Sequence, residues 1–174
     1  ALLPLGQEIA FAATLARRYR TVAGVLEAFS QAEQEALGQA REQQAFVAGS
    51  PLAEAHGTTY PILQGPMTRV SDVAAFCESV ADNGALPFLA LAMLRQTAVR
   101  ELLSETAERL GDRPWGVGVL GSVPAKLRRE QLRVLRQIRP NYAILAGGRP
   151  SHAKDLEALG IDTYLHVPSP GLLR

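Results

Sequence analysis

The feature that most constrains the fold is a regular alternation of short apolar runs with amphipathic segments. Apolar runs bounded by Gly and Pro lie at residues 61–63, 86–92, 115–120, 142–146 and 163–167. Between them, apolar residues recur at helical spacing over 70–83, 97–110, 125–138 and 151–159. The runs are continuously apolar, as in strands that are buried on both faces of a parallel sheet. The sequence therefore predicts a serial β/α architecture of the α/β class.

Two folds satisfy this pattern of five strands and four helices. A doubly wound sheet of flavodoxin type would be complete in about 115 residues. A closed (β/α)8 barrel needs about 250 residues, so this chain would hold only its first half. The periodicity alone does not choose between the two folds.

The first 50 residues have a different composition, rich in Ala, Gln, Glu and Leu, and predict a helical N-terminal segment at 1–50. Apolar residues recur at helical spacing over 8–19, and Thr21 is placed to cap a second helix. Residues 31–46 favour a helix with little apolar face. Gly, Ser, Pro and Thr then predict a linker at 51–60 before the β/α domain at 61–174.

Composition and charge exclude several classes of function. The chain has 174 residues, of which 47% are hydrophobic, and a formal net charge of +1 with no basic stripe for nucleic acid. The single cysteine, Cys77, excludes an internal disulfide and fits a reducing compartment. No apolar run reaches the roughly 18 residues of a membrane span. There is no signal peptide pattern, and we expect a cytoplasmic protein. Because the chain starts without methionine and stops at the start of a helical pattern, we expect a piece of a longer polypeptide.

In either fold, a ligand site is expected at the carboxyl ends of the strands. Taken one at a time, Gly and Pro after a strand are ordinary turn formers. Glycines at three of the five runs favour a rim where the backbone closely approaches a flat ligand. The sequence has no P-loop, and its one Gly-x-Gly-x-x-Gly spacing falls within a predicted strand. The residues at this rim are Gln64, Gly65, Pro66 and Met67 after the first run, 93–96 after the second, 116–118 with 121–122 around the third, 146–150 after the fourth and 166–170 in the fifth.

The titratable side chains define no catalytic set. His56 in the predicted linker and His152 near a helix start are expected to be solvated. His166 lies in the fifth run, where a core histidine and a ligand contact are equally compatible with its position. Cys77 falls on the apolar face of the predicted helix 70–83, which favours a buried structural thiol. The sequence predicts no metal site, and the catalytic residues stay unknown.

Five motifs carry a resemblance to a known family: YPILQGPMTRVSD, ADNGALPFLALAM, GDRPWGVGVLG, ILAGGRPSHAKDLEALGI and TYLHVPSP. In this order they resemble the nitronate monooxygenase (2-nitropropane dioxygenase-like) and flavin-dependent enoyl-acyl-carrier-protein reductase family, closest to versions embedded in bacterial polyketide synthases. The resemblance covers residues 59–174. It implies the N-terminal half of an FMN-binding TIM (β/α)8 barrel, with about four and a half β/α units after the helical segment.

The resemblance also implies a cofactor site. The first loop would lie against the isoalloxazine ring, and His166 would face it from the fifth strand. Gly118 stands where many relatives have an asparagine that contacts the flavin, so one polar contact is missing. The implied cofactor-binding residues are Gln64, Gly65, Pro66, Met67, Gly118, Ala146, Gly147, Gly148 and His166.

The implied activity is FMN-dependent reduction of an enoyl thioester, with NAD(P)H as electron donor and an acyl carrier protein as partner, in a polyketide or fatty-acid-type synthase. The alternative within the family is a nitronate monooxygenase. A second alternative is a non-catalytic structural or docking segment that pairs with a complementary half or with itself. The family's Gly-Gly-His catalytic segment and its phosphate-binding loops follow later strands, so we expect this fragment to bind FMN poorly and to be inactive.

Overall fold

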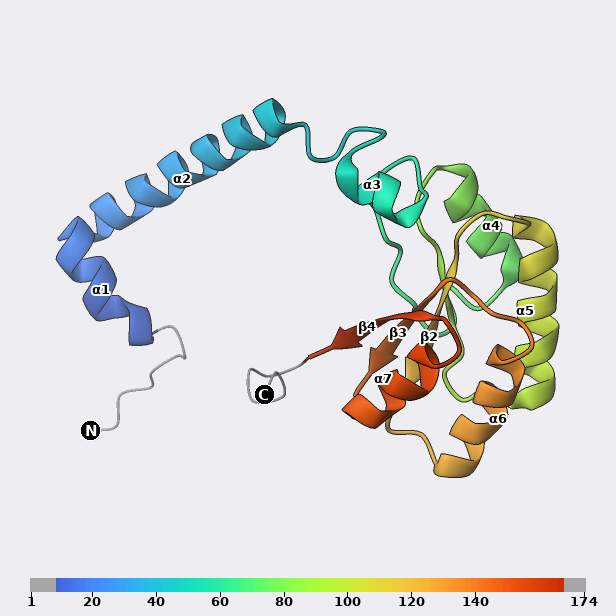
Figure 1. The fold of residues 1–174 in the computed structure, drawn as a ribbon. Helices are drawn as coiled ribbons and strands as arrows, with labels where there is room; N and C mark the ends of the chain where they lie inside the picture. The colour runs from blue at the N-terminus through green and yellow to red at the C-terminus, as the bar shows by residue number, and fades with distance from the viewer. Residues whose placement is uncertain (1–8, 168–174) are drawn as a thin grey trace, which may run out of the picture. The chain divides into compact units, whose positions relative to one another are not determined.

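The chain divides into two compact units, Ala1–Ala45 and Phe46–Arg174, in a computed structural model that describes residues 9–167. The first unit contains α1 (Ile9–Tyr19) and α2 (Val22–Gln43), drawn in blue in Figure 1. Thr21 precedes α2 in an extended conformation, and its hydroxyl accepts the Gly24 N–H at 3.0 Å. This bond satisfies one of the free amides at the start of α2, so the predicted cap is confirmed.

Helices α1 and α2 contain no buried residue. Their large apolar side chains remain largely exposed. Residue 8 of the first predicted helix lies outside the described residues. Within residues 9–167, no helix combines the length and the apolar character needed to cross a membrane. The exposed large apolar residues of this unit are Ile9, Phe11, Val22, Leu26, Phe29 and Leu37.

The segment predicted as a linker, 51–60, contains a helix, α3 (Pro51–His56). Ser50 precedes it and Pro51 opens it, where the fixed φ of proline suits a helix start. Gly57 closes it with a φ of +67°, and its N–H donates to Ala53 and Glu54 carbonyls. Three of the residues that suggested a linker, Ser50, Pro51 and Gly57, therefore begin or end this helix. The division between the two units also lies earlier than predicted, after residue 45.

The second unit is built on a parallel four-stranded sheet in the order β1-β2-β3-β4 (Figure 1). The strands are β1 (Phe88–Ala90), β2 (Gly116–Leu120), β3 (Tyr142–Ala146) and β4 (Asp162–His166). Each pairs with the next strand along the chain, whereas a doubly wound sheet reverses its strand order at a switch point. The sheet is therefore part of a barrel-type α/β fold, and the flavodoxin-type alternative is excluded.

The helices α4 (Ala74–Asp82), α5 (Gln96–Leu110), α6 (Ala125–Leu135) and α7 (Pro150–Glu157) alternate with these strands. Alternate strand residues point to these helices and form one hydrophobic core with them. We call this the outer face of the sheet and the opposite side its inner face. The outer-face strand residues in the core are Leu89, Val117, Val119, Ala143 and Leu145, and the helices add Cys77, Val99, Leu103, Leu110, Val134, Leu135, Ala153 and Leu156.

Among the described residues, four of the five predicted strands and the four predicted helices between them are present, but several differ in length. The first run forms only an isolated parallel bridge, Leu63 to Leu86, supported by a 2.9 Å bond from the Gln64 N–H to the Leu86 carbonyl. The second strand ends early because Ala92 adopts a φ of +39°, which extended backbone does not allow. Helix α4 starts at Ala74 rather than at 70, since Asp72 accepts the Arg69 N–H in a preceding turn.

Helix α3 covers the inner face near the amino ends of β3 and β4. The His56 ring lies 5.4 Å from the Tyr142 ring and 6.0 Å from the Tyr164 ring, between ring centroids. The Tyr164 ring meets Phe88 edge-on at 6.4 Å. Offset and edge-on contacts of this kind are favourable for aromatic rings. An aromatic cluster therefore fills this end of the inner face.

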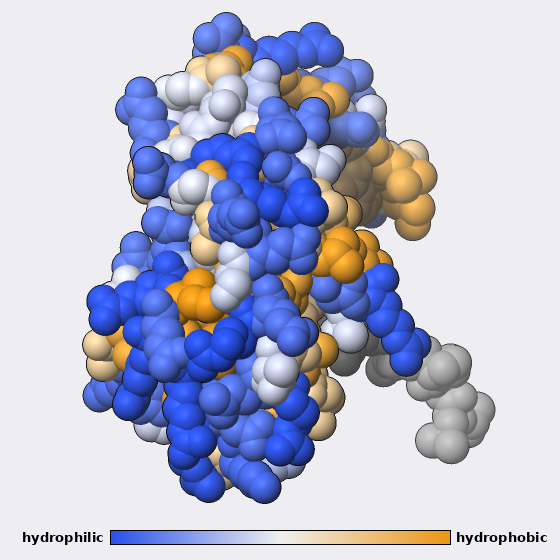
Figure 2. Space-filling model, turned by 90° about the vertical axis from the view of Figure 1, so that its right-hand side faces the viewer, coloured by the Kyte–Doolittle hydropathy of each residue, from blue (hydrophilic) through white to orange (hydrophobic). Residues whose placement is uncertain are grey.

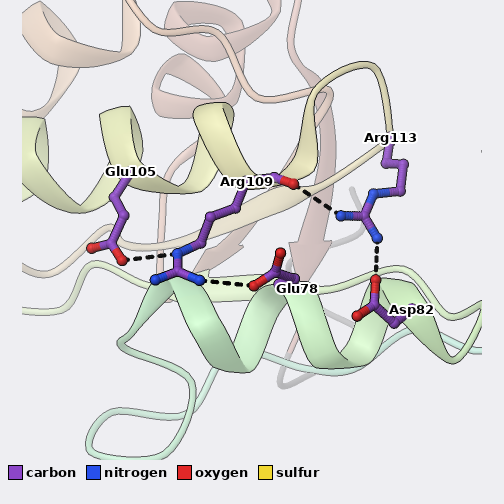
Figure 3. A network of polar contacts seen from close by, with 5 residues as sticks. All are labelled: Glu78, Asp82, Glu105, Arg109 and Arg113. Atoms are coloured by element: carbon purple, nitrogen blue, oxygen red, sulfur yellow. Dashed lines mark hydrogen bonds and ion pairs between the residues drawn. The ribbon is translucent and has the colours of Figure 1, made fainter.

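Exposed ion pairs connect α4 to α5, as Figure 3 shows. Arg109 donates to Glu78 and to Glu105, both at 2.9 Å, and Arg113 pairs with Asp82. The surface of this helical side is mainly hydrophilic (Figure 2). Because the charges are solvated, these pairs contribute little to stability, and the register of the two helices rests on the core beneath them.

Strand β4 differs from the other strands because most of its residues are exposed. Leu165 lies beside Leu145 in the register and points to the same outer face. Leu145 is only 1% exposed, but Leu165 is 49% exposed, because β4 is the edge strand of the described sheet.

The paired positions of Leu145 and Leu165 give a direct test of this packing. Leu145→Ala removes a buried side chain and is expected to lower the free energy of unfolding by about 2–5 kcal/mol. Leu165→Ala, the matched control in the next strand, is expected to cost less than about 1 kcal/mol. Urea unfolding can be followed by the fluorescence of Trp115, which is buried in the same core. Equal losses in the two variants would contradict the difference in burial between β3 and β4 on this face.

Candidate functional site

The inner face of the sheet opens into a small cavity near the carboxyl ends of β1, β2 and β3. Its volume is about 70 Å³, which is below the roughly 300–1,000 Å³ of complete ligand pockets. Small side chains from three strands leave this space, and the turn after the first bridge closes one side. The lining residues are Pro66, Thr68, Ala90, Ala92, Gly118, Val119, Leu120, Ile144 and Ala146.

A close contact between Gly118 and Pro66 fixes the floor of the cavity. Gly118 lies in β2 between Ala90 of β1 and Ile144 of β3, in register with both. A Cβ atom at Gly118 would come within 2.5 Å of two ring carbons of Pro66. Real Cβ atoms do not tolerate such distances, so only glycine lets the proline lie against the strand here.

The loop that carries Pro66 is anchored by Ser71, a fully buried residue. The Ser71 hydroxyl accepts the Met67 N–H at 2.7 Å, and the Ser71 N–H donates to the Met67 carbonyl at 2.8 Å. The Ser71 carbonyl accepts the Ala90 N–H of β1 at 2.7 Å. These bonds connect the loop to the sheet, so Pro66 is held in place from both sides.

Gln64 has a structural role in this arrangement. Its side-chain oxygen accepts the Phe88 N–H at 3.0 Å, in the place of a backbone carbonyl from a neighbouring strand. The side-chain amide also donates to the Gly65 carbonyl. Gln64 therefore extends the short bridge at residue 63 and satisfies the start of β1, and it does not line the cavity.

A second close approach holds the loops after β2 and β3 together. The Gly121 N–H donates to the Ala146 carbonyl at 2.8 Å. A Cβ at Gly121 would lie 2.6 Å from the Gly148 nitrogen and 2.8 Å from the Gly147 carbonyl oxygen. Gly147 itself has a φ of +64°, in the left-handed region that favours glycine. These three glycines thus form a junction of the loops that follow β2 and β3.

The structure brings together three of the predicted site residues, Pro66, Gly118 and Ala146, in the cavity wall. His166 is in register with Ala146 and lies on the same face of the sheet, but it is exposed and does not line the cavity. Met67 is 60% exposed, and the surroundings of Gly65 are open. The motif end at 168–170 lies outside the described residues.

Sequence reasoning missed six lining residues: Thr68, Ala90, Ala92, Val119, Leu120 and Ile144. Ala90 and Ile144 flank Gly118 in the register, so alternate positions of the three strands form this wall. The alternation of inward and outward residues would have found Ala90 and Ile144, whereas Thr68 and Ala92 lie in loops and Val119 belongs to the outer-face core. Continuous apolar runs hide that signal, because they do not show which residues face the helices.

Two predictions for the histidines change. His56, expected to be solvated, packs on Tyr142 and Tyr164; its Nδ1 lies 2.7 Å from the Leu52 carbonyl, and its Nε2 bonds with the Tyr164 hydroxyl. His152, also expected to be solvated, is half-buried, and its Nδ1 accepts the Arg149 N–H at 3.3 Å at the start of α7. Burial lowers the pKa of His152 below its usual value. Both histidines therefore support helices rather than a ligand site.

An ion pair connects Arg95, at the end of the loop after β1, to α6. Its guanidinium donates two bonds to the Glu130 carboxylate of α6, at 2.7 and 2.8 Å. The hydrogen bond from Arg95 lowers the pKa of Glu130 and keeps the carboxylate charged. Within residues 9–167, no cluster of three or more His, Cys, Asp or Glu residues is arranged to hold a metal ion.

Thr68 supplies the polar side chain of the cavity wall, and the other lining residues are apolar or glycine. The lining contains no acid, base or nucleophile of the kind that proton transfer requires. The arrangement can therefore hold a flat ligand against small residues.

The fold defines a class of protein: a segment of a parallel (β/α) barrel with a small-residue site at the carboxyl ends of its strands. Solved structures that it resembles include FabK from Thermotoga maritima (TM-score 0.60, 20% identity). Others are a nitroalkane oxidase from Streptomyces ansochromogenes (TM-score 0.57, 18% identity) and the enoyl reductase domain of MlnA from Bacillus amyloliquefaciens (TM-score 0.52, 18% identity). These proteins match the family indicated by the sequence motifs.

The matches cover 70%, 69% and 58% of this chain, but only 38%, 44% and 24% of the three solved chains. The chain thus spans less than half the length of the structures that it resembles. No protein-family model matches the sequence, and no curated protein matches it. At these identities, the likeness shows the fold.

The contact between Gly118 and Pro66 gives a second prediction. Gly118→Ala places a Cβ against the proline ring, and we expect the loop to move and the free energy of unfolding to fall by about 1–3 kcal/mol. Gly65→Ala, in the same loop but with no atom within 4 Å of its Cβ, is the control and is expected to change stability by less than about 0.5 kcal/mol. Urea unfolding measures both variants. An unchanged Gly118→Ala protein would refute the tight contact.

Cys77 gives a third prediction. It is buried in α4, as the sequence predicts, and burial raises its pKa to about 12. At pH 8, only about one thiol in ten thousand would then be ionised. A thiol reagent such as DTNB is expected to react with Cys77 only after unfolding in urea. Rapid stoichiometric labelling of the folded chain would contradict the burial.

Proposed function

We propose that this chain supplies one wall of the flavin site in an FMN-dependent enoyl-thioester reductase of barrel fold. The observation that carries the proposal is the cavity of small residues at the carboxyl ends of three successive parallel strands, the end at which barrel enzymes bind their ligands. The likeness to FabK and to the MlnA enoyl reductase domain supports this reaction over others on the same fold.

The residues present fit a planar ring. Gly118 and Ala146 leave the strand surface free of large side chains, and Pro66 offers a flat apolar surface next to them. A Cβ at position 118 would overlap Pro66, so the close approach depends on glycine. In this proposal Pro66, Gly118 and Ala146 hold the ring, and Gln64 and Ser71 hold the loop that carries Pro66.

When bound, FMN would supply the hydride chemistry, with NAD(P)H as the electron donor. The part of this chain would be to bind one side of the ring, to orient it on a rigid sheet and to exclude water from that side. The cavity lining contains no proton donor suited to the substrate, so we propose that residues outside this chain supply it. The acyl group would reach the site on an acyl carrier protein.

The second candidate is a nitronate monooxygenase, favoured by the likeness to a nitroalkane oxidase. The third is a structural or docking segment, favoured by the exposure of β4 on both of its faces. An uncovered edge strand next to an open inner face needs a partner, in the same polypeptide or in another copy.

The size of the cavity gives a fourth prediction, for the isolated chain. A volume of about 70 Å³ accommodates only part of an isoalloxazine ring, so FMN is expected to bind weakly and without turnover. Titration of FMN fluorescence with purified chain is expected to show no saturation at micromolar concentrations. If the purified chain is yellow and oxidises NAD(P)H, the claim that its site is incomplete is wrong.

The reaction itself is tested on the longest polypeptide that contains this chain. We expect oxidation of NAD(P)H that depends on FMN and on a crotonyl thioester. Oxygen uptake with a nitroalkane, without a response to the thioester, would replace this proposal with the nitronate alternative. If neither substrate reacts, sedimentation of the isolated chain will show whether self-association supports the docking alternative.

A further inference from the structure

The loop after β1 forms one wall of the cavity through an unusual backbone conformation. Ala92 lines the cavity with a φ of +39°, in a region that residues with a side chain rarely adopt. The Leu94 N–H donates to the Leu91 carbonyl at 2.8 Å and closes a tight turn around Ala92. Because alanine does not favour this conformation by itself, contacts from elsewhere must hold it.

Those contacts come from Gln131, a residue of α6 that is 1% exposed. Its side-chain Nε2 donates to the Ala92 carbonyl and to the Leu94 carbonyl, each at 3.1 Å. One amide group therefore bonds to the carbonyl oxygens on both sides of Met93. Both partners are acceptors, so the amide must present its NH2 group to them, and its orientation is determined.

The other end of the same amide has no partner among the described residues, since Oε1 of Gln131 is buried and makes no hydrogen bond. A buried acceptor without a partner destabilises a fold. Core stability alone therefore does not explain a buried glutamine at this position. What Gln131 contributes is the pair of hydrogen bonds that it donates to the loop after β1.

The neighbouring residue of α6 strengthens the connection. Glu130 receives the two hydrogen bonds from Arg95, at the end of the same loop. Consecutive residues of α6 thus bind the middle and the end of the loop that follows β1. The position of the loop after β1, which forms one wall of the cavity, therefore depends on the position of α6.

We propose that Gln131 is a positioning residue for the candidate site: it holds Ala92 in its positive-φ conformation and so sets the shape of the cavity wall that faces the ligand. The link to a flavin rests on the proposed function above. The link to the loop rests on the two hydrogen bonds, and it can be tested without any cofactor.

The test compares Gln131→Met with Gln137→Met. Methionine keeps the length of the side chain and removes the two donated bonds. Gln137 is an exposed glutamine that bonds to Arg100 and does not contact the loop, so its substitution is the matched control. We expect amide hydrogen exchange at residues 92–95 to become at least about tenfold faster in Gln131→Met. Exchange in β3 is expected to stay unchanged, and Gln137→Met is expected to behave as the parent chain.

Rescue separates positioning from general packing. In the double variant Gln131→Met with Ala92→Gly, glycine adopts the positive φ without help from Gln131. We therefore expect slow exchange at residues 93–95 to return towards the parent value. Equal exchange in the two methionine variants, or no rescue by glycine, would overturn the proposal.

If Gln131→Met does not fold, the parent chain decides the question. The side-chain NH2 protons of Gln131 are then expected to exchange with solvent much more slowly than those of Gln137, and fast exchange of both would overturn the proposal. In the longest polypeptide that binds FMN, Gln131→Met is expected to weaken FMN binding by about tenfold. If the parent polypeptide binds no FMN, the proposed function is refuted. The role of Gln131 is then decided by the hydrogen-exchange and rescue results alone.

Discussion

The burial of one face of the sheet under the helices is the constraint on which the rest of the structure depends. Leu89, Val117 and Leu145 point outward into a core with α5 and α6, and that core fixes the order and direction of the strands. Alternate residues must then point to the other face. Because the core forms on the outer face, the inner face does not need large apolar residues at every position. Gly118 and Ala146 can therefore leave the space that forms the cavity.

Contacts outside the cavity fix the two loops that form its walls. Pro66 approaches the sheet because Gly118 has no side chain, and Ser71 fixes the proline loop to β1. On the other side, Gln131 bonds to the loop that contains Ala92. The residues that hold the two loops are thus more polar than the cavity lining, as expected for a site whose shape must be preorganised.

Much of the fold could be predicted from the sequence, because the residues concerned interact with near neighbours in the chain. β3 was predicted with its observed bounds, and Thr21 was identified as a helix cap. The candidate site was predicted less well. Pro66, Gly118 and Ala146 were found through turn chemistry and resemblance, but Ala90 and Ile144 were not, because a uniformly apolar strand does not show which face each residue occupies. Gln131 gave no signal, since its partners lie 37 and 39 positions away.

The sequence by itself determined the alternation of strands and helices, the burial of Cys77 and the gathering of small residues after successive strands. These features follow from local spacing and from the conformational range of Gly and Pro. Only the tertiary structure decided that the strands lie in sequential order, that His56 packs on two tyrosines and that Gln64 completes the edge of the sheet. The physical reason is that strand pairing and side-chain hydrogen bonds join residues that are distant in the chain. The local spacing of residues does not determine which distant groups will meet.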